Sequence, residues 1–122
     1  MREFEHLRGA RAYTLHVLGE EVAEGDTGNK IIQGCEVVRS IEVEDKSDKL
    51  LGELTNKENY EPVSRRCKMY PQYAIEIEGK LVAVFDLESC PRIEYLANEE
   101  ETVFDIKMEN SIKAELEKLV AK

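Results

Sequence analysis

The strongest constraint on the fold comes from two alternating apolar segments that a short polar stretch, Glu78-Gly79-Lys80, separates. Apolar or aromatic residues occupy every second position on both sides of this stretch: Tyr73, Ile75, Ile77, Leu81, Ala83, Phe85 and Leu87. A period of two is typical of a β-strand with one buried face. A short glycine-containing stretch between two such strands is typical of a hairpin turn. The sequence therefore predicts an antiparallel hairpin over residues 73–87.

The length of the hairpin loop decides which residues face one another. A three-residue loop over Glu78-Gly79-Lys80 places Ile77 opposite Leu81 and keeps the apolar side chains on one face. A two-residue loop places Ile77 opposite Lys80 instead and mixes the faces. Because a shift of one residue moves side chains to the other face of a sheet, we expect the three-residue loop.

The hairpin also relates two of the three cysteines to each other. In either register Cys67 and Cys90 come within one position of facing each other, although Pro71 cannot donate to a ladder and interrupts the pairing before it reaches them. Facing positions bring Cα atoms to the roughly 4.4–6.8 Å that a disulfide requires. We therefore expect Cys67 and Cys90 to lie close together and to join under oxidising conditions, and Cys35 to stay free.

Alternating apolar residues predict further strands over residues 12–18, 31–44, 92–96 and 103–106. Gly34 is expected to break or bulge the second of these strands, because glycine lacks a side chain to pack. The segment from Glu24 to Asn29 is rich in glycine and in polar residues that tolerate a positive φ, which predicts a turn.

Two helices are predicted from apolar residues at helical spacing. Asp45 or Ser47 is expected to cap the first helix, and Asn110 or Ser111 the second, by accepting first-turn N–H groups. A polar connection is expected between the first helix and Pro71. The apolar stripes are formed by Leu50, Leu51 and Leu54 in the first helix and by Ile112, Leu116, Leu119 and Val120 in the second.

Strands outnumber helices in this pattern, and the connections are short, which favours antiparallel neighbours. A length of 122 residues suits one modest core. The sequence therefore predicts a single α+β domain over residues 1–122, mainly an antiparallel β-sheet with two helices packed on one face.

The chain is acidic, with 26 Asp and Glu against 17 Lys and Arg and a net charge of −9. The excess acid lies in both halves of the folded body. Such a surface repels nucleic-acid phosphates and anionic lipid, so we expect neither a nucleic-acid nor a membrane partner. It would attract a basic protein and speed the encounter. The same charge also serves solubility alone, and the sequence leaves both interpretations open.

The compartment is inferred from what the sequence lacks. No run approaches the roughly 18 apolar residues of a membrane-spanning helix, and no apolar stretch follows a basic start as in a signal peptide. An odd number of cysteines does not make a complete disulfide framework. We therefore expect a reducing, cytoplasmic location.

Two segments of the sequence partly resemble catalytic motifs, but neither matches its motif in full. Asp26-Thr27-Gly28 has the core triplet of retroviral-type aspartic proteases, but Glu24-Gly25 precede it where that family has an apolar strand. The segment from Gly25 to Lys30 lacks the spacing of a phosphate-binding loop. A polar turn explains both features.

The spacing of the histidines and cysteines does not indicate a metal site or a Cys-His catalytic pair. The soft ligands are scattered and form no paired motif: His6, His16, Cys35, Cys67 and Cys90. His16 lies on the strand face opposite Leu15 and Val17, so we expect it to be exposed rather than held as a catalytic base. We therefore expect no catalytic residues, no metal, no cofactor and no enzyme activity.

A short basic cluster stands out against the acidic background. Arg65, Arg66 and Lys68 fall within four positions and could contact a phosphate or a carboxylate. Pairing with neighbouring surface acids is the alternative and the commoner arrangement.

The pattern Cys67-x-x-x-Pro71-x-x-Ala74-Ile75, then Gly79-Lys80 and Cys90-x-x-Ile93, resembles an uncharacterised family of small bacterial proteins. Its members carry a Cys-x-x-Pro-Arg-His-[Ala/Gly]-Ile segment and a strand that ends in Phe-Glu-Cys. The resemblance covers roughly residues 30–96. Here one extra residue precedes Pro71, Gln72-Tyr73 replaces Arg-His, and Glu88-Ser89-Cys90 replaces Phe-Glu-Cys. No activity is known for this family, so the resemblance says nothing about activity, but it implies that the two cysteines belong together.

Size, charge and the absence of a catalytic motif favour a small acidic binding protein. We expect it to engage a basic protein, as an immunity or inhibitor protein does. The alternative is a thiol-based redox or ligand-sensing protein that uses Cys67 and Cys90.

Overall fold

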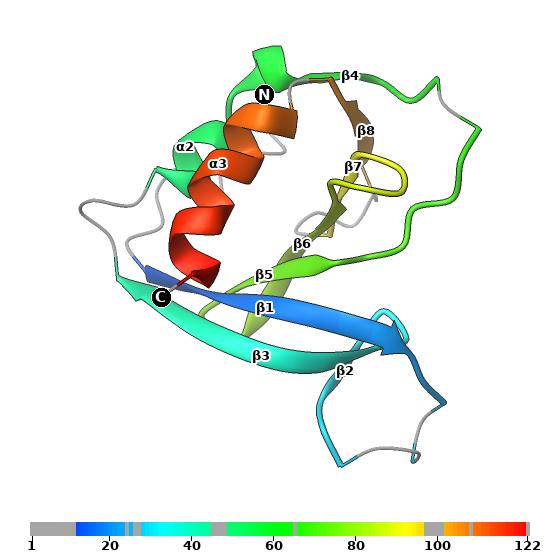
Figure 1. The fold of residues 1–122 in the computed structure, drawn as a ribbon, viewed down its shortest axis with the longest axis vertical. Coiled ribbons are helices and arrows are strands. Elements are labelled where there is room, and N and C mark those ends of the chain that lie inside the picture. The colour runs from blue at the N-terminus through cyan, green and yellow to red at the C-terminus, as the bar shows by residue number, and fades with distance from the viewer. Residues whose placement is uncertain are drawn as a thin grey trace.

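The computed structural model describes residues 12–23, 25, 28–44, 49–64, 66–96, 102–107 and 109–121. Within them the strands are β1 (Ala12–Glu21), β2 (Ile31–Ile32), β3 (Cys35–Glu44), β4 (Tyr60–Pro62), β5 (Tyr73–Ile77), β6 (Lys80–Asp86), β7 (Arg92–Tyr95) and β8 (Thr102–Ile106). The helices are α2 (Leu50–Leu54), the 3-10 turn η2 (Lys57–Asn59) and α3 (Glu109–Val120). The eight strands of this described part form one antiparallel sheet in the order β2-β3-β1-β5-β6-β7-β8-β4. Figure 1 shows α2 and α3 on the same side of this curved sheet, and the predicted α+β class is confirmed.

The main core lies between the two helices and one face of the sheet. The helices contribute side chains that are at most 2% exposed: Leu50, Leu54, Ile112 and Leu116. The sheet contributes Leu15, Ile75, Phe85, Ile93 and Ile106. The predicted apolar stripes of both helices therefore face the sheet, and their burial removes several large side chains from water.

A second, smaller apolar cluster covers part of the opposite face. Leu18, Ile32, Ala74 and Val84 are buried there, and Met69, Leu81 and Leu96 pack against them. The centre of the sheet is thus covered on both faces. This explains why β6 is an almost continuous apolar run rather than a strict alternation.

The hairpin register differs from the prediction close to the turn. Tyr73 pairs with Phe85 as expected, but an irregularity after Ile75 shifts the pairing, so that Ile77 faces Lys80. Glu78 and Gly79 have φ values of 52° and 78°, which are the two left-handed positions of a two-residue hairpin turn. The three-residue loop is therefore wrong, and the extra residue sits inside β6 as a bulge instead. As a consequence Leu81 joins the second apolar cluster rather than the main core.

Several element boundaries also differ from the expectation. Gly34 does break the β-rich segment, as the second residue of the turn between β2 and β3, where Gln33 and Gly34 have φ values of 52° and 81°. The expected polar connection after α2 contains β4, which pairs with β8. α3 begins at Glu109, so the predicted caps Asn110 and Ser111 lie inside it. Asp45 and Ser47 lie outside the described residues, and Lys49 precedes α2 without a side-chain cap.

Among the helices described, none is both long and apolar enough to cross a membrane.

Candidate functional site

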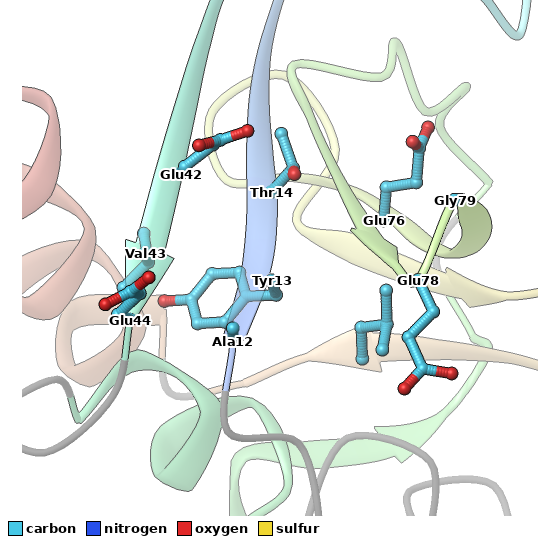
Figure 2. A pocket seen from close by; sticks show the side chains of 10 residues that line it. Ala12, Tyr13, Thr14, Glu42, Val43, Glu44, Glu76, Glu78 and Gly79 are labelled. Atoms are coloured by element: carbon cyan, nitrogen blue, oxygen red, sulfur yellow. The ribbon is translucent and has the colours of Figure 1, made fainter.

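A groove of about 630 Å³ opens at one end of the sheet, where β1, β3 and β5 lie side by side. Figure 2 shows the side chains that line it. Four of them are carboxylates, from Glu42, Glu44, Glu76 and Glu78, and none of the lining residues is basic. The lining of the groove is therefore acidic.

Strand pairing places these carboxylates. Thr14 of β1 lies opposite Glu42 of β3 on one side and opposite Glu76 of β5 on the other. Neighbouring strands are about 4.8 Å apart, so the backbones of Glu42 and Glu76 lie roughly 10 Å apart, with Thr14 between them. Figure 2 shows all three side chains extending toward the same side. Glu44 follows two residues along β3, and Glu78 occupies the adjacent turn.

Glu76 is the only one of the four that the structure pairs with a base in its described part. Lys30 Nζ donates to Glu76 Oε1 at 2.7 Å, and His16 Nε2 lies 3.4 Å from the same oxygen. The hydrogen bond from Lys30 is the main reason why the pKa of Glu76 is lowered, against a smaller opposing effect of burial. Glu42, Glu44 and Glu78 are exposed, and they remain available to a ligand.

His16 is buried, contrary to the expectation that it would be exposed. It does face away from the main core, but the second apolar cluster covers that side of β1. Its Nδ1 lies 2.7 Å from Ser40 Oγ and its Nε2 faces Glu76. The imidazole thus lies between Ser40 of β3 and Glu76 of β5.

The exposed carboxylates of the groove can bind cationic groups of a ligand. Exposed carboxylates form charge-assisted hydrogen bonds with ammonium and guanidinium groups. In the residues that the structure describes, no group of three or more His, Cys, Asp or Glu side chains is placed to hold a metal ion. The triplet residues Asp26 and Thr27 lie outside the described residues, and His6 does too.

The second candidate site is the disulfide between Cys67 and Cys90, whose Cα atoms are 5.8 Å apart. This is the pairing that the hairpin and the family resemblance led us to expect. Cys90 is fully buried, whereas Cys67 lies on the exposed segment between β4 and β5. Cys35 is free and buried, and burial, followed by the nearby charge of Glu21, raises the pKa of its thiol.

A buried carboxylate beside the disulfide organises the loop that carries Cys90. Asp86 Oδ1 accepts hydrogen bonds from the backbone N–H groups of Glu88 and Ser89 at 2.9 and 3.3 Å. Asp86 Oδ2 accepts from the N–H of Cys90 at 3.0 Å and from that of Tyr70 at 3.4 Å. One carboxylate therefore fixes both chain segments that the disulfide joins. An acidic residue directly after an apolar run was the signal for this role, which the sequence analysis missed.

A second buried carboxylate holds the other end of the same segment. Asp105 Oδ2 accepts a hydrogen bond from Ser64 N at 2.8 Å, and Asp105 Oδ1 accepts one from Arg92 Nε at 2.8 Å. Arg92 Nη1 also donates to the backbone oxygen of Cys67 at 3.1 Å. The segment from β4 to β5 is thus attached at Ser64, Cys67 and Tyr70. The signal that was overlooked is an aspartate inside the apolar alternation of β8.

The basic cluster lies on this attached segment. Arg66 and Lys68 are exposed, and Lys68 Nζ lies 5.1 Å from the centroid of the Tyr70 ring. Arg65 lies outside the described residues. The expected pairing of Arg66 and Lys68 with surface acids is not seen in the described part of the chain. Their role as anion contacts stays a prediction.

A smaller hollow of about 400 Å³ lies between the end of α3 and the start of β5. Tyr73 lines it, and burial, followed by the charges of Glu88 and Glu117, raises the pKa of the tyrosine hydroxyl. Lys113 also lines this hollow, and its positive charge is opposite in sign to the charges of the two carboxylates. Its electrostatic character is therefore mixed, unlike that of the groove.

No family model, no curated protein and no solved structure matches the chain. The resemblance to the family of small bacterial proteins stays a prediction.

Proposed function

We propose that this chain is a binding protein whose acidic groove receives basic side chains of a protein partner. The observation that carries the proposal is the set of three exposed carboxylates, from Glu42, Glu44 and Glu78, around one groove without a basic lining residue. The net charge of −9 adds long-range attraction for the same kind of partner. Engagement of a basic enzyme by an immunity or inhibitor protein is one form that such binding takes.

The test measures where a cation binds rather than only whether it binds. A short lysine-rich peptide is titrated into labelled protein, and amide chemical shifts are followed by NMR. We expect shifts confined to the groove strands and strong weakening of binding in the Glu42→Gln/Glu44→Gln variant. Shifts scattered over the whole acidic surface would contradict the proposal.

A matched control separates the groove from net charge. The Glu20→Gln/Glu58→Gln variant removes two exposed carboxylates outside the groove and changes the net charge equally. We expect this control to bind the peptide almost as well as the unmodified protein. Equal weakening in both variants would show that the groove has no special role.

The disulfide favours a second candidate function, a thiol-based redox or ligand-sensing protein. Cys67 lies on an exposed segment, where a thiolate can reach its sulfur. A dithiol would break the S–S bond, become a cyclic disulfide itself and leave thiols at Cys67 and Cys90. The test is a reversible, dithiol-dependent change in peptide binding, and a protein that binds equally in both redox states would not be such a sensor.

A further inference from the structure

We propose that the basic partner binds as an additional β-strand along the outer edge of β3. This inference rests on the proposed function, because it uses the glutamates of the same groove. It adds the conformation of the partner, an extended segment, and the pattern of its side chains.

No described strand pairs with the outer edge of β3 over residues 40–44. There β3 pairs with β1 on one side, from Ser40 opposite His16 to Glu44 opposite Ala12. On the other side β2 reaches only Cys35 and Glu36, and no other described strand pairs with β3. Figure 1 shows β3 running along the margin of the sheet beyond β2. A strand edge of this kind presents backbone N–H and C=O groups that can pair with another chain.

The opposite edge of the sheet is far less suited to strand addition. β4 has three residues, Tyr60–Pro62, and ends in a proline, which has no N–H to donate. Short edge strands and prolines are common means by which proteins prevent unwanted pairing. The two edges therefore differ, and β3 is the one that can accept a strand.

The side chains of β3 define the occupant. Ser40, Glu42 and Glu44 lie on the groove face, so residues of the added strand that face them should be lysine or arginine. Ile41 is partly exposed and lies on the face that packs against the main core, so the alternate residues should be apolar. Opposite charges on neighbouring strands stabilise their pairing, whereas like charges disfavour it. A second copy of this acidic edge is therefore a poor occupant, and an alternating basic and apolar segment is a good one.

The test uses two synthetic peptides of about seven residues, which is long enough to span residues 40–44 at roughly 3.4 Å per residue. Both alternate lysine and valine, but the second is N-methylated at every residue, so it keeps the charges and loses the backbone donors. Binding is measured by calorimetry with the full chain, and hydrogen exchange follows the amides of residues 40–44. We expect at least tenfold weaker binding of the methylated peptide. We also expect slower exchange, with the unmodified peptide only, of the amides that point away from β1.

Each other outcome overturns the inference in an identifiable way. Equal affinity of the two peptides in the groove would leave the proposed function standing and exclude strand addition. Failure of both peptides to bind there would reject both proposals. Amides at residues 40–44 that all exchange slowly before any peptide is added would show that the edge is already covered. If that protection grew with protein concentration, a second copy of the chain would be the occupant.

Discussion

Glu76 combines a structural role with its position in the acidic groove, and its pairing with Lys30 predicts a pH dependence. The lowered pKa means that this carboxylate contributes stability above the unfolded-state value of 4.5, and that the contribution is lost as the pH falls through the folded-state value. Glu76→Gln should therefore cost about 0.2–1 kcal/mol at neutral pH, since Lys30 is half exposed. The cost should shrink as the pH falls through the folded-state pKa of Glu76. Urea titrations at neutral pH and at a series of acidic pH values measure it, and a constant cost would contradict the assigned pairing.

Glu78 lowers the stability of its turn through its backbone conformation, while its carboxylate lines the acidic groove. Its φ of 52° lies in the left-handed region, where a residue with a Cβ is disfavoured by roughly 1–2 kcal/mol. Asparagine tolerates this turn position better. Glu78→Asn should therefore raise the free energy of unfolding by up to about 1 kcal/mol and weaken binding of a lysine-rich peptide. Gln33→Asn, at the equivalent position of the other turn, is the control that should stabilise the protein without affecting the peptide.

At the scale of elements, the sequence predicts those helices and strands whose apolar pattern is compatible with only one structure. The stripes of α2 and α3 and the alternation in β5 place the main core on the correct side of the sheet. The bulge in β6 was not predicted, because Leu81 to Phe85 are all apolar and satisfy either register. β4 was not predicted because its three residues include Pro62 and gain their pairing only from β8. The groove depends on pairing between β1, β3 and β5, which no local pattern specifies.

The packing of α3 gives a prediction at this scale. Leu116 is 2% exposed and lies in the main core with Ile112, whereas Leu119 is only partly buried. Leu116→Ala should lower the free energy of unfolding by about 2–5 kcal/mol, because it removes buried methyl groups and leaves a cavity. Leu119→Ala should cost clearly less. Urea unfolding curves compare the two variants, and a loss below about half a kcal/mol for Leu116→Ala would show that α3 does not pack as described.

The disulfide connects elements that lie far apart along the chain. It closes a loop with a sequence separation of 23 residues and ties the segment after β4 to the turn after β6. The double variant Cys67→Ser/Cys90→Ser should lose about 3 kcal/mol of stability through the greater entropy of its unfolded chain. Asp86 and Asp105 hold the same segment through hydrogen bonds, so the variant should still fold. Thermal unfolding with and without reductant measures the loss. The control Cys35→Ser keeps the disulfide, so reductant should destabilise it as much as it destabilises the unmodified protein.

For the whole molecule, the net negative charge predicts how fast a basic partner arrives. A net charge of −9 steers cations toward the protein from a distance, and salt screens this attraction over about 8–10 Å at physiological ionic strength. The association rate constant of a lysine–valine peptide should therefore fall steeply as salt is added, whereas its dissociation rate should change less.

The two charge variants separate the effect of the net charge on association from the effect of groove contacts on dissociation. Glu42→Gln/Glu44→Gln and Glu20→Gln/Glu58→Gln each change the net charge from −9 to −7, by removing two carboxylates. Long-range attraction depends on total charge, so both variants should slow association to a similar, modest degree. Only the groove variant should also speed dissociation, because it alone removes contacts made in the complex. Stopped-flow measurements over a range of salt concentrations give both rates. A groove variant with unchanged dissociation would show that the carboxylates of β3 attract the partner without touching it.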